Sequence, residues 1–172
     1  MAETMKDKFA NQAVITCTES AANTLTFKKL ETGISLFEKV AWVISRIEYF
    51  VSNQLAAVFN GDGDSLQFAL TATDQITTLS LTNAAVLDYI ELMRGDYGTA
   101  ASMHFINRPI TKDFSSLPGG GILCPPNPLY LGVKGTGLVN ADTVIAKLFY
   151  VNLALKAEEY WELVESRRII SS

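Results

Sequence analysis

Short segments in which apolar and polar residues alternate recur along this chain, separated by turn residues. Alternation with a period of two is typical of half-buried β-strands. After the β-branched residues that follow Ala13, the segments that alternate or form short apolar runs are Thr24–Phe27, Val40–Val51, Ser65–Leu70, Ile76–Leu81, Ser102–Ile110, Leu129–Val133 and Thr143–Leu155. About eight strands of this length predict an all-β fold: an antiparallel β-sandwich, specifically an eight-stranded jelly roll with short helices.

The longest of these segments, Val40–Val51, is largely apolar on both faces. This pattern predicts a central strand that is covered on both sides. Strand parity puts Arg46 and Glu48 on one face, and we expect them to pair with each other or with a neighbouring strand. The apolar residues divide into a first face with Trp42, Ile44 and Phe50 and a second face with Val43, Ile47, Tyr49 and Val51.

Two segments are compatible with a helix. Asn83–Arg94 fits either a helix capped by Asn83 or a strand, because its apolar residues match both periods. From Lys156 the sequence predicts a short C-terminal helix or tail, with glutamates in its first turn and arginines in its last. The apolar face of this helix consists of Tyr160, Trp161 and Val164.

All five prolines of the chain lie between Pro109 and Pro128, around the run Gly119–Gly121. Proline fixes φ and glycine admits positive φ, so this composition predicts a long, shaped loop. We expect Leu117–Leu131 to be an interface or rim loop. The C-terminal aromatic pair is expected to anchor the tail, either onto its own sandwich or onto that of a neighbouring subunit. The candidate interface residues are Pro118, Gly119, Gly120, Gly121, Pro125, Pro126, Tyr160 and Trp161.

The composition favours a single domain that must hide apolar surface. Of the 172 residues, 48% are hydrophobic and only 19% are charged, and the net charge is −4. We expect a mobile arm over residues 1–12 and a single jelly-roll domain over 13–172. A chain with so little charge must hide apolar surface, and a subunit interface is one place to do so. The sequence has no apolar run long enough to cross a membrane and no signal peptide, so no membrane partner is expected.

The residue types needed for catalysis or zinc binding are scarce. His104 is the only histidine, and Cys17 and Cys124 are far apart in the sequence. Histidine-dependent nucleophilic catalysis and zinc coordination both need clusters that this chain does not offer. We therefore expect no enzyme activity, no catalytic residues and no cofactor. Free thiols are the simplest reading of the two cysteines, with one disulfide as the alternative.

The segments PGGG, CPPNPLYLGVKGTG, VIAKLFYVNLAL and EEYWELVESRR, together with EKVAWVISRIEYFV, resemble single-jelly-roll capsid proteins of small icosahedral viruses. The similarity is to the environmental circular single-stranded DNA type and its tombusvirus-like relatives. It implies a coat protein that self-assembles as a large homo-oligomeric shell around a small genome. It also implies assembly inside the host cell and localisation in the virion.

The resemblance bears on two further sites. Capsid proteins of this type bind calcium between subunits, which makes Asp62 and Asp64 candidate ligands, although Asn60–Asp64 also has the composition of a turn. Such proteins also begin with a basic arm, whereas here Lys6 and Lys8 are balanced by nearby acidic residues. These two lysines are the candidate nucleic-acid contacts.

Two other classes of protein share this type of fold. A non-catalytic carbohydrate-binding module would need exposed aromatic residues on one sheet, and the candidates are Trp42, Tyr49, Phe68 and Phe149. A cupin-like enzyme would need several histidines, which the sequence lacks.

Overall fold

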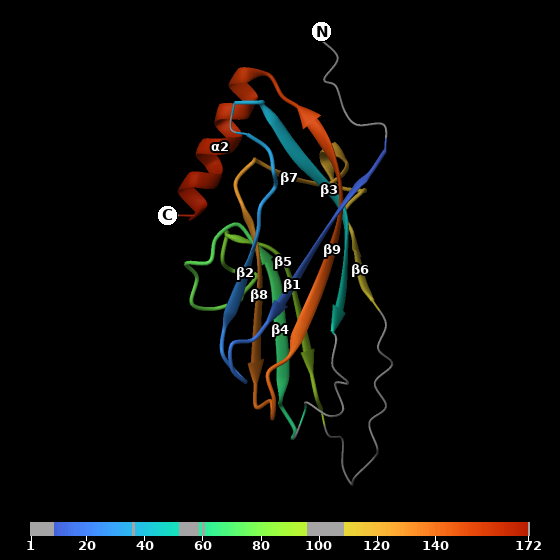
Figure 1. The fold of residues 1–172 in the computed structure, drawn as a ribbon, viewed down its shortest axis with the longest axis vertical. Coiled ribbons are helices and arrows are strands. Elements are labelled where there is room, and N and C mark those ends of the chain that lie inside the picture. The colour runs from blue at the N-terminus through green and yellow to red at the C-terminus, as the bar shows by residue number, and fades with distance from the viewer. Residues whose placement is uncertain (1–8, 36, 52–58, 60, 96–108, 172) are drawn as a thin grey trace.

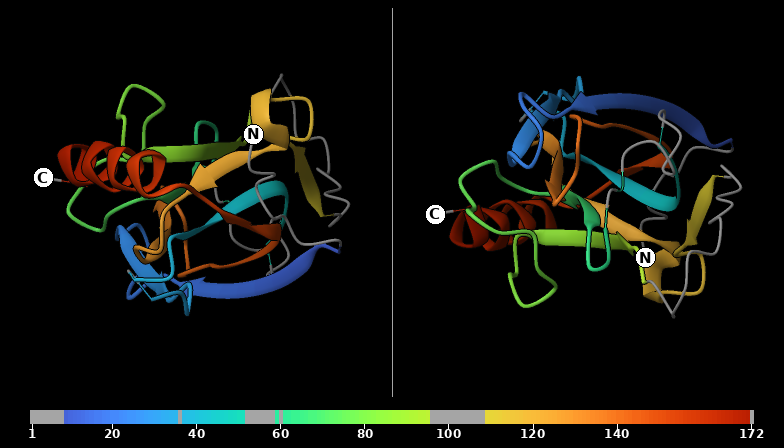
Figure 2. Two further views of the ribbon diagram at one scale, coloured as in Figure 1. Left: turned by 90° about the horizontal axis from the view of Figure 1, so that it is seen from above. Right: turned by 90° about the horizontal axis from the view of Figure 1, so that it is seen from below.

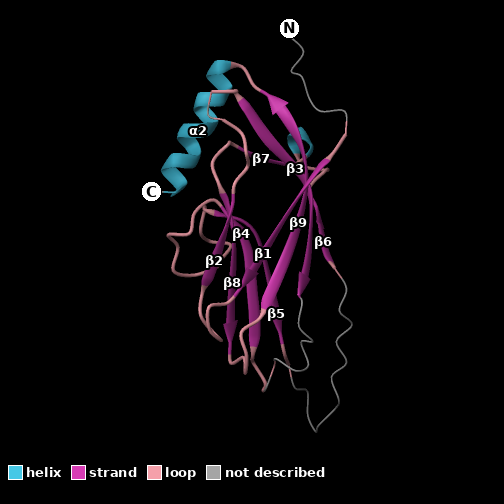
Figure 3. Cartoon of the chain, in the orientation of Figure 1, coloured by secondary structure: helices cyan, strands magenta, loops and turns pink. Residues whose placement is uncertain are grey.

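The computed structural model describes residues 9–171 except for 36, 52–58, 60 and 96–108 (Figure 1). Strands dominate the described residues, with one α-helix and one 3₁₀ turn (Figure 3). The strands are β1 Asn11–Thr18, β2 Thr26–Leu30, β3 Val40–Val51, β4 Ser65–Thr71, β5 Val86–Met93, β6 Ile110–Asp113, β7 Ile122–Cys124, β8 Leu129–Thr136 and β9 Thr143–Ala154. The 3₁₀ turn is Pro118–Gly120, and helix α2 is Ala157–Ser171.

The strands form two antiparallel sheets that pack face to face as two layers (Figure 2). One sheet has the order β1-β9-β3-β6, with β7 also paired to β3, and the other has the order β2-β8-β4-β5. If β6 and β7 are taken as one interrupted strand, each sheet has four strand positions, as in a jelly roll. The predicted antiparallel β-sandwich of jelly-roll type is therefore confirmed.

A β-bulge at Ser45 corrects the predicted faces of β3. The pairing of β3 with β9 shifts between Ile44 and Arg46, so strand parity reverses at this point. As a result Ile44 and Ile47, predicted on opposite faces, both belong to the buried core, whereas Phe50 is only partly buried. The predicted partnership of Arg46 and Glu48 is confirmed by an ion pair of 3.5 Å between Arg46 Nε and Glu48 Oε1.

The core between the sheets is built from the inward residues of every long strand. The tilted rings of Tyr49 and Phe68, whose centroids are 5.2 Å apart, join the two layers near its centre. Both side chains are fully buried. Large fully buried aliphatic side chains fill the surrounding space: Ile44, Ile47, Leu66, Leu70, Leu131 and Leu148.

The predicted strand Ile76–Leu81 is wrong, because this segment belongs to a loop between β4 and β5. The loop closes on itself through a hydrogen bond of 2.8 Å from Ala72 N to Ala85 O. It lies over the outer face of the four-stranded sheet, where Leu79 is buried beside Gly132. Serine and threonine hydroxyls form local hydrogen bonds in the loop, and such bonds compete with strand pairing.

The ambiguous segment Asn83–Arg94 forms strand β5 from Val86 to Met93. Asn83 does not cap a helix; its Oδ1 accepts the N–H of Ala85 at 2.9 Å in a turn just before the strand. Of the predicted strand Ser102–Ile110, residues 102–108 lie outside the described residues, and β6 begins at Ile110. Residues 1–8 of the predicted arm, with Lys6 and Lys8, also lie outside them, and β1 begins at Asn11.

The predicted C-terminal helix is confirmed as α2, with Glu158 and Glu159 in its first turn. It lies at one end of the sandwich, next to the start of β3 and the end of β9 (Figure 1). Tyr160 is fully buried, as expected for an anchor. The expectation that Trp161 shares this packed face is wrong, because 52% of Trp161 is exposed.

Candidate assembly surfaces

The Pro- and Gly-rich segment is an excursion from the edge of a sheet. β6 pairs with β3 as far as Arg46 and Asp113, and β7 resumes the pairing at Ile44 and Ile122. The intervening residues 114–121 leave the sheet at the Ser45 bulge, where Ser45 O accepts the N–H of Phe114 at 2.7 Å. Pro118 and Gly119 at its tip are exposed. This part of the predicted interface loop is therefore available to a partner.

Gly121 allows the excursion to rejoin the sheet. A Cβ atom at this position would lie 2.3 Å from Ile44 O, so only glycine permits the close approach. Gly119 and Gly120 both have positive φ, of 84° and 79°. The three glycines that the sequence singled out therefore have structural roles in the tight turn itself.

The second half of the predicted interface loop consists of buried residues and the start of strand β8. Pro125 and Pro126 are buried, and Pro126 O accepts a hydrogen bond of 2.9 Å from Thr32 Oγ1. Residues from Leu129 onward belong to β8. The prediction of one long loop over Leu117–Leu131 is therefore wrong, because β7 and β8 divide it. The predicted interface role of Pro125 and Pro126 stays untested.

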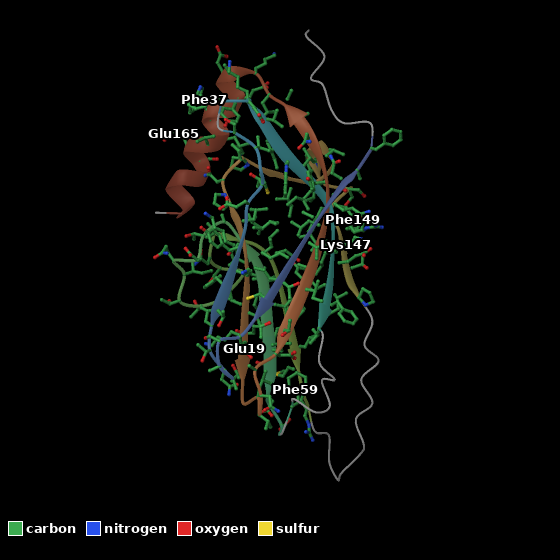
Figure 4. The ribbon with its side chains drawn as sticks, viewed as in Figure 1. Glu19, Phe37, Phe59, Lys147, Phe149 and Glu165 are labelled. Atoms are coloured by element: carbon green, nitrogen blue, oxygen red, sulfur yellow. The ribbon has the colours of Figure 1, made fainter. Side chains whose placement is uncertain are left out.

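Several large apolar side chains are exposed on the described surface. Phe37, beside helix α2 at the upper end in Figure 4, is 89% exposed. A soluble monomer exposes few such residues, and contiguous apolar surface marks a site of interaction. The full set is Phe9, Val14, Phe37, Leu81, Met93, Leu117, Val139 and Trp161.

The outer face of the five-stranded sheet carries a cluster of cations on an aromatic ring. Lys147 and Phe149, labelled in Figure 4, lie two residues apart on β9. The guanidinium carbon of Arg46 lies 4.1 Å from the centroid of the Phe149 ring, and Lys147 Nζ lies 5.0 Å from it. Glu48 partly neutralises the cluster through its ion pair with Arg46. The outer face of the five-stranded sheet therefore carries charged groups of both signs around an aromatic ring.

This arrangement removes the aromatic platform that a carbohydrate-binding module requires. Trp42, Tyr49 and Phe68 are buried in the core, and Trp42 stacks on Tyr150 with 3.7 Å between ring centroids. Phe149 is already in contact with two cations. Three of the four candidate aromatic residues are therefore unavailable for sugar stacking, and Phe149 alone does not form an aromatic platform.

Asp62 and Asp64 belong to the turn before β4. Asp64 Oδ2 accepts the N–H of Gly61 at 2.6 Å, so one carboxylate oxygen stabilises the turn itself. Asp62 is exposed. Within the described ranges no group of three or more histidine, cysteine or acidic side chains is placed to hold a metal ion. A calcium ion at this turn would therefore need ligands from beyond it.

A network of polar side chains joins the loops at the lower end of the sandwich, where Figure 4 labels Glu19. The buried carboxylate of Glu19 accepts the N–H of Gly135 at 2.7 Å and that of Asp142 at 3.0 Å. The side chain of Asn23 binds the loop between β8 and β9: it donates a hydrogen bond to Leu138 O at 3.0 Å and accepts one from Leu138 N at 2.8 Å. Together these bonds hold the β1–β2 loop against the β8–β9 loop.

The sequence reasoning missed a buried ionisable cluster between the two sheets. Asp88 is 7% exposed and points inward from β5, and its nearest cation is Lys112 on β6, with 3.9 Å between Lys112 Nζ and Asp88 Oδ1. Burial raises the pKa of Asp88, an effect that Lys112 only partly offsets. Burial and the charge of Asp88 raise the pKa of Tyr49. An aspartate at an inward position of β5 is the sequence signal for this cluster.

Neither the cysteines nor the hollow beside one of them offers a reactive site. Neither cysteine forms a disulfide and both are buried, so the disulfide alternative is not realised. Burial raises the pKa of Cys17 to about 11, which keeps it protonated. A hollow of about 10 Å³ lies beside Cys124, between Leu87 and Pro125. It has room for about one water molecule, far less than a small-molecule ligand needs.

No family model and no curated protein matches this sequence. Among solved structures, the fold is similar to polyomavirus VP1 chains. The Trichodysplasia spinulosa-associated polyomavirus VP1, in complex with GM1 oligosaccharide, matches with a TM-score of 0.53 and 10% identity over 87% of this chain and 97% of that chain. The apo chimpanzee polyomavirus VP1 matches with a TM-score of 0.52 and 10% identity over 87% and 96%.

A third similar structure is the unassembled pentamer of Merkel cell polyomavirus VP1, with a TM-score of 0.54 and 9% identity over 90% of this chain and 100% of that chain. At this level of identity the likeness shows the fold. It extends over most of the sandwich, which confirms the jelly-roll architecture independently of strand order.

In the part of the chain that the structure describes, no helix is long and apolar enough to cross a membrane.

Proposed function

We propose that this chain is a structural capsid protein that assembles with copies of itself into an icosahedral shell around a small genome. The observation that carries the proposal is the jelly-roll fold, whose likeness to three polyomavirus VP1 structures covers 87–90% of the chain. The low charge and the exposed apolar side chains support it, because neighbouring copies would cover such surface. The role is non-catalytic, and the assembled protein belongs to the virion, built inside the host cell.

Negative-stain electron microscopy of the purified full-length protein tests this proposal. We expect uniform closed particles, with sedimentation velocity showing assemblies of many copies. A small monodisperse species at every protein concentration and salt concentration would contradict the proposal. Repeating the preparation with calcium and with a chelator tests Asp62 and Asp64, since a calcium-dependent shell should lose particles only in the chelator.

Two details of the proposal concern particular residues. Pro118 and Gly119 at the tip of the edge excursion, with the neighbouring Leu117, are proposed to contact another copy. Leu117 is 44% exposed, so Leu117→Glu should reduce assembly without unfolding the subunit. Val139→Glu, at an exposed loop residue on another part of the sandwich, is the matched control.

Genome contact through Lys6 and Lys8 is the second detail. Phosphate binding depends on displaced counterions, so two lysines give only a weak dependence on salt. Particles of the double variant Lys6→Ala, Lys8→Ala should enclose less nucleic acid, measured by the absorbance ratio of purified particles. An unchanged nucleic-acid content would contradict a role for these lysines. The proposal that the chain forms a shell would still stand.

A further inference from the structure

Strand β1 forms one edge of the five-stranded sheet and pairs only with β9 within the described structure. Its eight residues, Asn11–Thr18, include no charged residue and no proline. An edge strand of this length without charge or proline is a template for pairing with another strand. Such edges aggregate in a monomer and serve as interfaces in an assembly.

The other edges of the two sheets all carry features that oppose pairing. β2 has five residues and includes Lys28 and Lys29. β5 carries Glu91 as well as the buried Asp88. The edge formed by β6 and β7 is broken by the excursion at residues 114–121 and is followed by two prolines. Charges and prolines on edges prevent strand addition, so β1 differs from every other described edge.

Half of the β1 edge is accessible. Near its end, β1 approaches β2, where Cys17 Sγ donates to Thr26 O at 3.4 Å. Toward its start, β1 runs away from β2, as the views in Figures 1 and 2 both show. In this open half, Gln12, Val14 and Thr16 alternate with Ala13 and Ile15, so their exposed side chains lie on the outer face of the sheet, and Val14 is 58% exposed. Because no described strand lies beyond this half of β1, a partner strand has access along Gln12–Thr16.

We propose that β1 pairs antiparallel with β1 of a second copy of this chain, about a two-fold axis near Val14, joining two five-stranded sheets. This deepens the proposed function, on which it rests. A second β1 is the partner favoured by charge, because neither strand brings a charge that would lose solvent at the contact. The contact is isologous, so each Val14 meets the same region of its partner.

The test places a charge at the proposed axis. Val14→Lys should weaken self-association of the full-length protein about tenfold or more, since like charges face each other across the two strands. Val14→Thr keeps a neutral β-branched residue and should associate as the native protein does. Val139→Lys, at a residue 56% exposed in the β8–β9 loop, controls for a new surface lysine. Sedimentation velocity measures association, and near-ultraviolet circular dichroism confirms folding.

A charge-swap mixture distinguishes strand pairing from damage to the fold. Val14→Lys and Val14→Glu should each fail to pair alone and should pair when mixed, because opposite charges then face each other. In hydrogen exchange, alternate amides of Gln12–Thr16 should be protected in the associated native protein and exposed in Val14→Lys.

The inference would be overturned if Val14→Lys associated as strongly as the native protein, or if the mixture of the two variants showed no recovery of association. If native particles form while the mixture fails, the capsid proposal stands and the β1 contact does not. If the native protein pairs through β1 but never forms particles, the β1 contact stands and the capsid proposal does not.

Discussion

Glu19 and Asp142 are joined by two reciprocal hydrogen bonds, one from Glu19 N to Asp142 O and one from Asp142 N to Glu19 Oε2, both 3.0 Å long. The second oxygen of Glu19 accepts the N–H of Gly135 at 2.7 Å. A single buried carboxylate therefore satisfies one backbone donor near the end of β8 and one in the β8–β9 connection. Sequence inspection gives no reason to single out this glutamate, since its partners are more than a hundred residues away.

Replacing Glu19 should destabilise the lower end of the sandwich. Glu19→Ala leaves two buried N–H groups without their acceptor, and we expect a loss of roughly 2–4 kcal/mol in the free energy of unfolding. Chemical denaturation monitored by tryptophan fluorescence measures this loss. Glu38→Ala, at an exposed glutamate, should change stability little. Equal effects of the two substitutions would contradict the bracing role of Glu19.

Asp88 should make the folded protein less stable as the pH rises. Burial raises its pKa in the folded state, so the folded protein holds this proton more tightly than the unfolded chain. The stability that Asp88 contributes through this tighter proton binding is fully present below the ordinary aspartate pKa. It is lost as pH rises through the raised pKa of the folded state. Asp88→Asn should therefore raise the melting temperature at pH 7 and change it little at pH 3.

Glu91, three residues along β5, provides a control of opposite sign. The hydrogen bond from Gln67, and a second from Tyr89, lower its pKa. Its contribution is present above the ordinary glutamate pKa and is lost as pH falls through the lowered value. Glu91→Gln should therefore slightly lower the melting temperature at pH 7 and have no effect at strongly acidic pH. Shifts of the same sign for both variants would contradict the assignment.

Gly121 should be intolerant of a side chain. Gly121→Ala places Cβ against Ile44 O, so either β7 or the bulged part of β3 must move. We expect a loss of about 1–3 kcal/mol, as for overpacked sites in general. Gly61→Ala is the matched control, because nothing lies within 4 Å of its added Cβ and its φ is negative or extended. Thermal unfolding of the two variants measures the difference.

The tail should be anchored by Tyr160 and much less by Trp161. Tyr160→Ala removes a fully buried ring, and we expect a cost of about 3 kcal/mol or more. Trp161→Ala removes a ring that is 52% exposed and should cost clearly less. Limited proteolysis at the C-terminus, with thermal unfolding, separates the two. A larger effect from Trp161 on the isolated subunit would show that the anchor is misassigned.

Cys17 should resist modification in the native protein. Its pKa of about 11 leaves almost no thiolate at pH 8, and its side chain is 1% exposed. A thiol reagent should label Cys17 only after denaturant is added, as followed by mass spectrometry of peptides. Rapid native labelling would contradict the position of β1 over the core.

The class of fold followed from local pattern, because period-two alternation is preserved wherever a strand has one buried face. The faces of β3 did not follow, since a one-residue bulge at Ser45 reverses parity without any mark in the sequence. The segment Ile76–Leu81 also alternates, but it forms a loop that buries Leu79 against the outer face of a sheet. Its structure is determined by this tertiary contact, which the local pattern does not reveal.

The candidate sites were less predictable than the fold. Glycine and proline around Gly119 indicated a turn correctly, but the pattern could not show that Pro125 and Pro126 are buried while Pro118 is exposed. The pairing of Asp88 with Lys112, and of Glu19 with Asp142, depends on strand order across the whole chain. Contacts of such long range carry no signature in local periodicity.

The excursion at residues 114–121 leaves β3 beside Arg46 and returns beside Ile44, so its two ends meet positions of one strand that are separated only by Ser45. Lengthening it between Pro118 and Gly119 therefore needs no change in either sheet. A peptide inserted at the tip should therefore leave the subunit folded, while it blocks the contact with another copy that we propose for Leu117, Pro118 and Gly119.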